Sequence, residues 1–140
     1  MKKVIDKLNE FLEGNYMAIH TYDHYIFHTD DPKIKEVLQN IQQNHKEHAA
    51  IIAERIQNLG GIPVHDVGLK GKMVEMASKM KGTKDTVSII KDAISGESRG
   101  IETSKKILED TLDEESKQIV QEILKRDEEH VNLLKSYLKT

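Results

Sequence analysis

The sequence contains no cysteine and no tryptophan, and proline is scarce, with two residues in a chain of 140. The lack of cysteine excludes disulfides, thiolate catalysis and cysteine-ligated zinc or iron–sulfur sites, and it fits the reducing cytoplasm, where we expect the protein. No apolar run is long enough to span a bilayer, and the first twelve residues hold no signal-like apolar stretch, so no membrane association is expected. No basic block stands out at a net charge of −3, which argues against nucleic acid as a partner.

Helical periodicity runs along almost the whole sequence and predicts one all-α domain over residues 1–140. A first helix is expected to end near Thr29, and a second to begin at Pro32 behind an aspartate N-cap and stop at Gly60–Gly61. A third helix follows residues 82–83, and a short turn at residues 112–113 leads to a fourth. In the third helix the inward-facing apolar residues are predicted to be Val87, Ile90, Ile94, Ile101 and Leu108.

One long connection, from residue 60 to about residue 83, separates the second and third helices. Within it, residues 69–81 have the pattern of a short amphipathic helix. Two tight helical hairpins joined by one long crossover form the layout of a ferritin-like four-helix bundle, whereas an up-down-up-down bundle would have three short loops. We therefore predict the ferritin-like architecture.

The side of each helix that is expected to face the core also contains polar residues, and these lie at one height along the bundle. Residues equidistant from the turn of an antiparallel hairpin lie side by side, and the two turns centre near Asp31 and Asp113. Counting from these turns places six polar side chains in one layer of an otherwise aliphatic core. They are Asn15, His45, His48, Glu97, Asp127 and His130.

Five of these six residues are of the types that bind metal ions. His45 and His48, like Asp127 and His130, are spaced i and i+3, so each pair shares one helix face. Burying such groups without partners would cost several kcal/mol each, and a bound cation removes that cost. The alternative is a closed network of salt bridges without a metal. The convergence of the two i, i+3 pairs with the carboxylate of Glu97 at the same height favours the metal.

Several segments resemble the ferritin-like superfamily, bacterioferritins and rubrerythrins in particular. Residues 8–22 are similar to a bacterioferritin first helix, residues 123–130 are similar to its last helix, and the end of the second helix at residues 60–63 also matches. Residues 68–81, followed by Gly96–Glu97, look closer still to a bacterial four-helix family of unknown function. The resemblance implies a metal centre inside the bundle.

In that superfamily the di-iron centre takes a glutamate from each of two helices and a Glu-x-x-His motif from each of the other two. By this resemblance, His48 and His130 match the motif histidines, and Glu97 matches the third-helix glutamate within one position. The pattern is broken where the glutamates are replaced by Asn15, His45 and Asp127.

These departures favour a single metal ion, because His45 cannot bridge two ions and Asp127 is shorter than glutamate; a second, looser site stays open. The ligands would be His45, His48, Glu97, Asp127 and His130, with Asn15 as a weaker candidate. An imidazole and carboxylate set suits iron, zinc or manganese, and the resemblance favours iron. Lys46 stands where bacterioferritins carry a haem-ligating methionine, so no haem is expected.

Three functions remain open. The site could carry ferroxidase-like or other non-haem iron oxidoreductase chemistry with a small oxidant, or it could be a structural or storage site in a stress-related protein. The third alternative is an interaction module that holds no metal. Tyr16 and Phe27 are expected on the surface beside a stripe of histidines at 20, 24 and 28, and by analogy with the superfamily we expect a homodimer or higher homo-oligomer through the first two helices.

Glycines also lie at the height of the polar layer, at Gly14 and Gly96, with Gly100 one turn away. Glycine inside a helix costs about 1 kcal/mol relative to alanine. Two explanations are equally open at this point: space for a metal or small molecule to enter, or close packing of helices.

Overall fold

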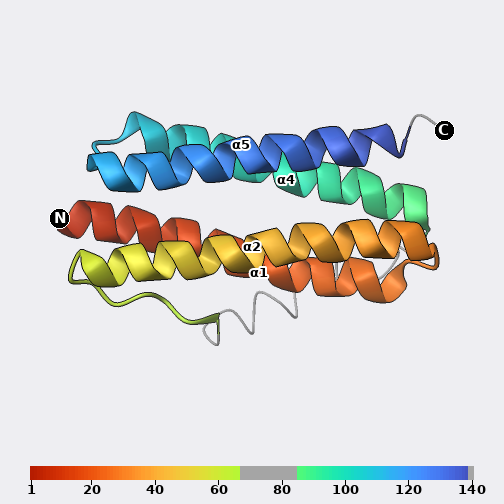
Figure 1. The fold of residues 1–140 in the computed structure, drawn as a ribbon, viewed down its shortest axis with the longest axis horizontal. Coiled ribbons are helices and arrows are strands. Elements are labelled where there is room, and N and C mark those ends of the chain that lie inside the picture. Colours follow the sequence, from red (N-terminus) through yellow and green to blue (C-terminus); the bar gives the residue numbers. More distant parts are fainter. Residues whose placement is uncertain (67–84, 139–140) are drawn as a thin grey trace.

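The computed structural model describes residues 1–66 and 85–138, which form four long helices and no strand. The helices are α1 (Lys2–His28), α2 (Pro32–Asn58), α4 (Thr86–Glu109) and α5 (Glu114–Ser136). Figure 1 shows α1 and α2 as one antiparallel hairpin and α4 and α5 as a second hairpin beside it. Because α2 ends and α4 begins at opposite ends of the bundle, the two hairpins have the connectivity of a crossover bundle. The predicted all-α, ferritin-like four-helix bundle is confirmed; the helix predicted at residues 69–81 lies outside the described residues.

Aspartate side chains set the beginnings of three helices. Asp31 accepts hydrogen bonds from the backbone N–H groups of Lys33 (2.9 Å) and Ile34 (3.3 Å), and Pro32 occupies the first helical turn. Asp85 and Asp113 cap α4 and α5 in the same way. These caps satisfy backbone donors that have no partner inside the helix, so they fix where each helix starts.

The polar layer divides the apolar core into two parts. One part, around Leu38, Ile90 and Leu134, lies toward the α1–α2 turn, and the other, around Leu8 and Ile52, lies toward the chain's N-terminus. Both parts are built from all four helices, so the bundle is closed by aliphatic packing on either side of the layer. None of the helices in the described part of the chain is long and apolar enough to cross a membrane.

Two predictions of which side chains are buried or exposed, for Val87 and Tyr16, need correction. Val87 was expected to face inward, but its side chain is 53% exposed, and Ile89 is buried in its place. The first turn of α4 therefore turns a different side toward the core from the side that the apolar spacing predicts. Phe27 is exposed as predicted, whereas Tyr16 is half-buried against the core. Of the histidine stripe, His20 contacts Asp66 (Nε2 to Oδ2, 3.3 Å), which links the segment after α2 to α1.

Candidate metal centre

Four side chains from three helices meet in the polar layer. His45 comes from α2, Glu97 from α4, and Asp127 and His130 from successive turns of α5. One ligand atom from each residue lies within 4.8 Å of the others, and all four residues are buried. The i, i+3 spacing predicted from the sequence therefore does bring Asp127 and His130 to one point.

Glu97 is the centre of the cluster. Its Oε2 accepts a hydrogen bond from His45 Nε2 at 2.9 Å, and its Oε1 accepts one from His130 Nδ1 at 2.6 Å. Burial alone would raise the pKa of Glu97, but these two hydrogen bonds and the histidine charges outweigh it and hold the pKa at about 2. Burial lowers the pKa of His130, yet the nearby carboxylate of Asp127 and the hydrogen-bonded carboxylate of Glu97 outweigh burial and raise it to about 9. Near neutral pH the layer thus holds an ionised Glu97 against a protonated His130.

The buried atoms near this pair that have no hydrogen-bond partner in the described part of the chain include Asp127 Oδ1 and His48 Nδ1. Asp127 Oδ1 lies 3.6 Å from His130 Nδ1, too far for a hydrogen bond. Burial raises the pKa of Asp127, and the negative charge of Glu97 raises it further. An unsatisfied buried polar atom costs roughly 1–3 kcal/mol, so each of these atoms is a place where a further partner would stabilise the protein.

His48 lies at the edge of the group. Its ring is 6.2 Å from that of His45, centroid to centroid, and it does not belong to the four-residue cluster. Burial lowers its pKa to about 4, with further lowering by the charges of His45 and His130. His48 is therefore neutral at pH 7 and retains the imidazole lone pair that a metal ion requires.

The orientation of His130 depends on Asn44, which sequence reasoning missed. The side-chain amide of Asn44 lies 3.0 Å from Nε2, the outer nitrogen of the ring, which leaves Nδ1 directed at the carboxylates. Metal-ligating histidines are commonly held in this way by a second hydrogen bond. The only sequence signal for this role is that Asn44 directly precedes His45.

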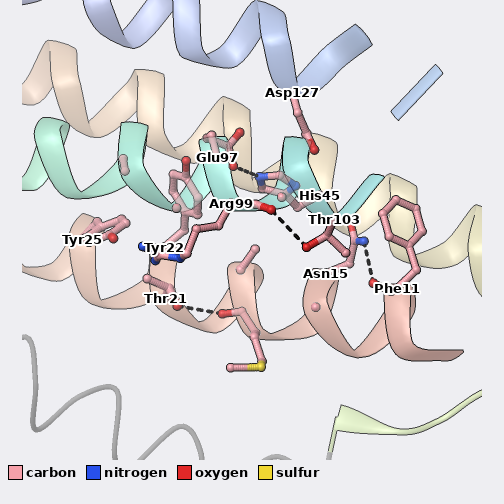
Figure 2. A pocket seen from close by; sticks show the side chains of 16 residues that line it. Phe11, Asn15, Thr21, Tyr22, Tyr25, His45, Glu97, Arg99, Thr103 and Asp127 are labelled. Atoms are coloured by element: carbon pink, nitrogen blue, oxygen red, sulfur yellow. Dashed lines mark hydrogen bonds and ion pairs between the residues drawn. The ribbon is translucent and has the colours of Figure 1, made fainter. Parts of the chain in front are cut away.

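A pocket of about 250 Å³ opens between α1 and α4 and reaches the cluster. His45, Glu97 and Asp127 line it together with Asn15, the sixth residue of the predicted layer. Figure 2 shows Asn15 and Tyr22 extending from α1 toward these residues. Asn15 Nδ2 donates to the Phe11 carbonyl at 2.9 Å, so this amide is anchored to its own helix rather than to the cluster. All six predicted residues therefore lie in or beside one site, but only four form the compact group.

A family model described as "Domain of unknown function (DUF2383)" matches residues 3–110, which include nearly all of α1 and the whole of α2 and α4. The chain belongs to this family. No functionally curated protein matches the chain.

Solved structures show the same fold. The bacterioferritin-related protein of Bacteroides fragilis, a dodecameric thioferritin, is 26% identical with a TM-score of 0.81, over 99% of this chain and 85% of that one. A DPS protein from Vibrio cholerae O1, described as a member of the ferritin-like diiron-carboxylate proteins, is 20% identical (TM-score 0.80, 98% and 89% covered). A ferritin-like, diiron-carboxylate protein from Bacillus anthracis str. Ames is 23% identical (TM-score 0.72, 98% and 96% covered). The chain is a member of the ferritin-like superfamily, as its residues predicted.

Proposed function

We propose that the chain binds a divalent transition-metal ion, iron in the first instance, in the polar layer of the bundle. The buried cluster of His45, Glu97, Asp127 and His130 carries this proposal, because it offers two nitrogen and two oxygen donors within 4.8 Å of one another. His48 is proposed as a further ligand. Asn15, at the pocket side, is the weaker candidate.

The unpartnered atoms support a cation at this place. Asp127 Oδ1 and His48 Nδ1 are sealed from solvent and unsatisfied, and a metal ion would give both a partner. The proton on His130 would be released on binding, because a ligating imidazole must be neutral. Zinc and manganese suit the same donors, and the diiron-carboxylate proteins among the structural relatives favour iron.

Bound iron would supply one-electron redox chemistry toward a small oxidant, and the pocket between α1 and α4 offers the oxidant a way in. The chain's own residues would position the ion, exclude bulk water by the aliphatic core on either side, and keep the oxidant beside Asn15. This redox role is the finer part of the proposal. A structural or storage site would need the same ligands without the chemistry.

The rival function is an interaction module without metal. Its support is that Glu97 already receives hydrogen bonds from both His45 and His130, so a large part of the layer satisfies itself. Metal analysis separates the two, because a self-contained network has no reason to retain an ion through dialysis.

The deciding experiment is metal content by plasma mass spectrometry on untagged protein after anaerobic loading with ferrous iron and dialysis. We expect about one equivalent per chain in the wild type and its loss in His45→Ala/His130→Ala, because the cluster offers one compact set of donors. His24→Ala/His28→Ala, which removes two histidines of α1 outside the cluster, is the matched control and should retain the ion.

About two equivalents would indicate a dinuclear centre of the superfamily's type despite Asn15 and His45. Absence of iron, zinc and manganese after loading with each would overturn the metal proposal and leave the buried network. Oxygen consumption on adding ferrous iron tests the redox role separately; metal retention without oxygen consumption would assign a storage or structural site.

A further inference from the structure

The pocket beside the metal centre is kept open by glycines rather than by loose packing. A Cβ built at Gly14 would meet no atom within 4 Å, and at Gly96 it would meet only the tip of Arg99 at 3.7 Å. At Gly100 it would lie 3.6 Å from Asp127 Oδ2, an ordinary contact. Close approach of helix backbones therefore does not explain these residues. Each glycine inside a helix lowers stability by roughly 1 kcal/mol relative to alanine, and all three of these glycines line the pocket.

The pocket is larger than a diatomic oxidant requires. Its volume of about 250 Å³ would hold roughly eight water molecules at ~30 Å³ each. Phe11, Ala18 and Ala93 give it apolar walls. A pocket of this size and lining suits a short organic molecule.

Two polar groups at different depths indicate what kind of molecule fits. The Tyr22 hydroxyl is at the inner end, in a side chain 3% exposed, and has no hydrogen-bond partner in the described part of the chain. The carboxylate of Glu97 lies near enough to raise the pKa of Tyr22, after the larger effect of burial, but no hydrogen bond of acceptable geometry joins them. A buried, unpartnered O–H in a side chain that lines a pocket is a vacant donor for a ligand.

Arg99 is the second polar group and lies at the rim. Its guanidinium donates to Ser95 Oγ at 3.3 Å, and no carboxylate among residues 1–66 and 85–138 pairs with it. A guanidinium without a carboxylate partner presents a planar fork that matches an incoming carboxylate.

We propose that this pocket binds a small organic carboxylate, with the carboxylate on Arg99, the apolar body against Phe11 and Ala93, and an acceptor atom at the inner end on Tyr22. This inference rests on the proposed function for the place of the acid beside a metal ion: a divalent ion at the cluster would offset the charges of Glu97 and Asp127 and so strengthen the binding of an anion. The bound acid would then lie beside the metal ion, as a substrate or co-substrate does.

The test is calorimetric titration of zinc-loaded and metal-free protein with 4-hydroxybenzoate and 4-hydroxybutyrate, each compared with its neutral amide. We expect the acids to bind, the amides to bind about tenfold more weakly, and Arg99→Gln to remove that difference, since each 1.4 kcal/mol of lost ion pairing is a factor of ten. Gly14→Leu, which fills the mouth of the pocket, should abolish binding. Gly14→Ala adds one methyl group to the same helix position and serves as its matched control.

Equal binding of acid and amide, or Arg99→Gln binding like the wild type, would overturn the carboxylate assignment. No binding of either acid to either form of the protein would overturn it as well. Metal content measured on the same samples keeps the two proposals apart. If zinc is retained and no acid binds, only the pocket inference fails; if no metal is retained but an acid binds in an Arg99-dependent manner, the metal proposal fails and the carboxylate pocket stands.

Discussion

His48 and His130 hold opposite protonation states although both belong to the polar layer. Burial keeps the pKa of His48 at about 4, and the carboxylates of Asp127 and Glu97 outweigh burial and keep that of His130 at about 9. The two residues therefore make the stability of the metal-free protein depend on pH in different ranges: His130 above the ordinary histidine pKa and His48 below it. His130 contributes stability that is fully present below pH 6.5 and is lost as the pH rises toward 9.

For His48 the sign is the reverse. Between pH 6.5 and about 4 the unfolded chain binds a proton that the folded chain does not, so the free energy of unfolding falls as the pH falls through this window. We expect the urea midpoint of the metal-free wild type to decrease between pH 6.5 and 4, and to decrease clearly less in His48→Gln. His28→Gln is the control. Parallel pH profiles for His48→Gln and wild type would contradict the neutral, buried state of His48.

Glu97 is the single residue on which the cluster depends. Glutamine at this position removes the negative charge that contacts both His45 and His130. We therefore expect Glu97→Gln to destabilise the metal-free protein by about 1.5–3 kcal/mol, the range for hydrogen bonds to a charged group. The same variant should fail to retain iron. Chemical denaturation at pH 7 and metal analysis measure the two effects independently, and an unchanged denaturation midpoint would show that the network contributes nothing to folding.

At the scale of the helices, two glycines should respond to alanine in opposite directions. Gly14 is inside α1 with open space around its Cβ position, so Gly14→Ala should stabilise the protein by up to about 1 kcal/mol through helix propensity. At Gly61 a Cβ would lie 2.7 Å from Ile5 Cγ2 and 3.1 Å from Ile56 Cγ2. We expect Gly61→Ala to cost about 1–3 kcal/mol by overpacking. Thermal unfolding of the pair checks both, and equal shifts would contradict the described packing.

The junction between α2 and α5 depends on Asp113. Its Oδ2 accepts from the Ser116 backbone N–H at 3.1 Å, which caps α5, and from Arg55 of α2 at 2.7 Å. Asn retains the cap and loses the ion pair, whereas Ala loses both. We expect Asp113→Ala to cost about 1.5 kcal/mol and Asp113→Asn less than about 1 kcal/mol, with only the ion-pair part weakened by salt. Urea unfolding at low and high salt checks this, and equal costs for both variants would mean that the cap is dispensable.

For the whole molecule, we expect self-association through the α1–α2 face. Phe27, near the end of α1, is 80% exposed, and this large apolar side chain is a suitable contact between copies. Phe27→Ser should lower the mass found by sedimentation velocity, because the contact loses its apolar area. Ile62→Ser, at a residue 81% exposed in the segment after α2, is the matched control. A Phe27→Ser variant that sediments like the wild type would place the interface elsewhere.

Much of the site was predictable because helix spacing and hairpin counting are geometric. Counting from Asp31 and Asp113 was enough to bring Asn15, His45, Glu97, Asp127 and His130 to one level. The count cannot give the rotation of each helix about its axis or the rotamer of each side chain. For that reason His48 was expected within the cluster and lies at its edge, and Val87 was expected inside and is exposed.

The sequence by itself determined the helices, their aspartate caps and the composition of the polar layer, because these depend on local hydrogen bonding and on periodicity along one chain. Only the tertiary structure decided that Glu97 joins His45 and His130, that Asn44 orients His130, and that space remains beside Gly14 and Arg99. These features arise where side chains from different helices meet. Their positions depend on how the helices are rotated and packed against one another, and spacing along a single helix gives that rotation only coarsely, as a broad core-facing side.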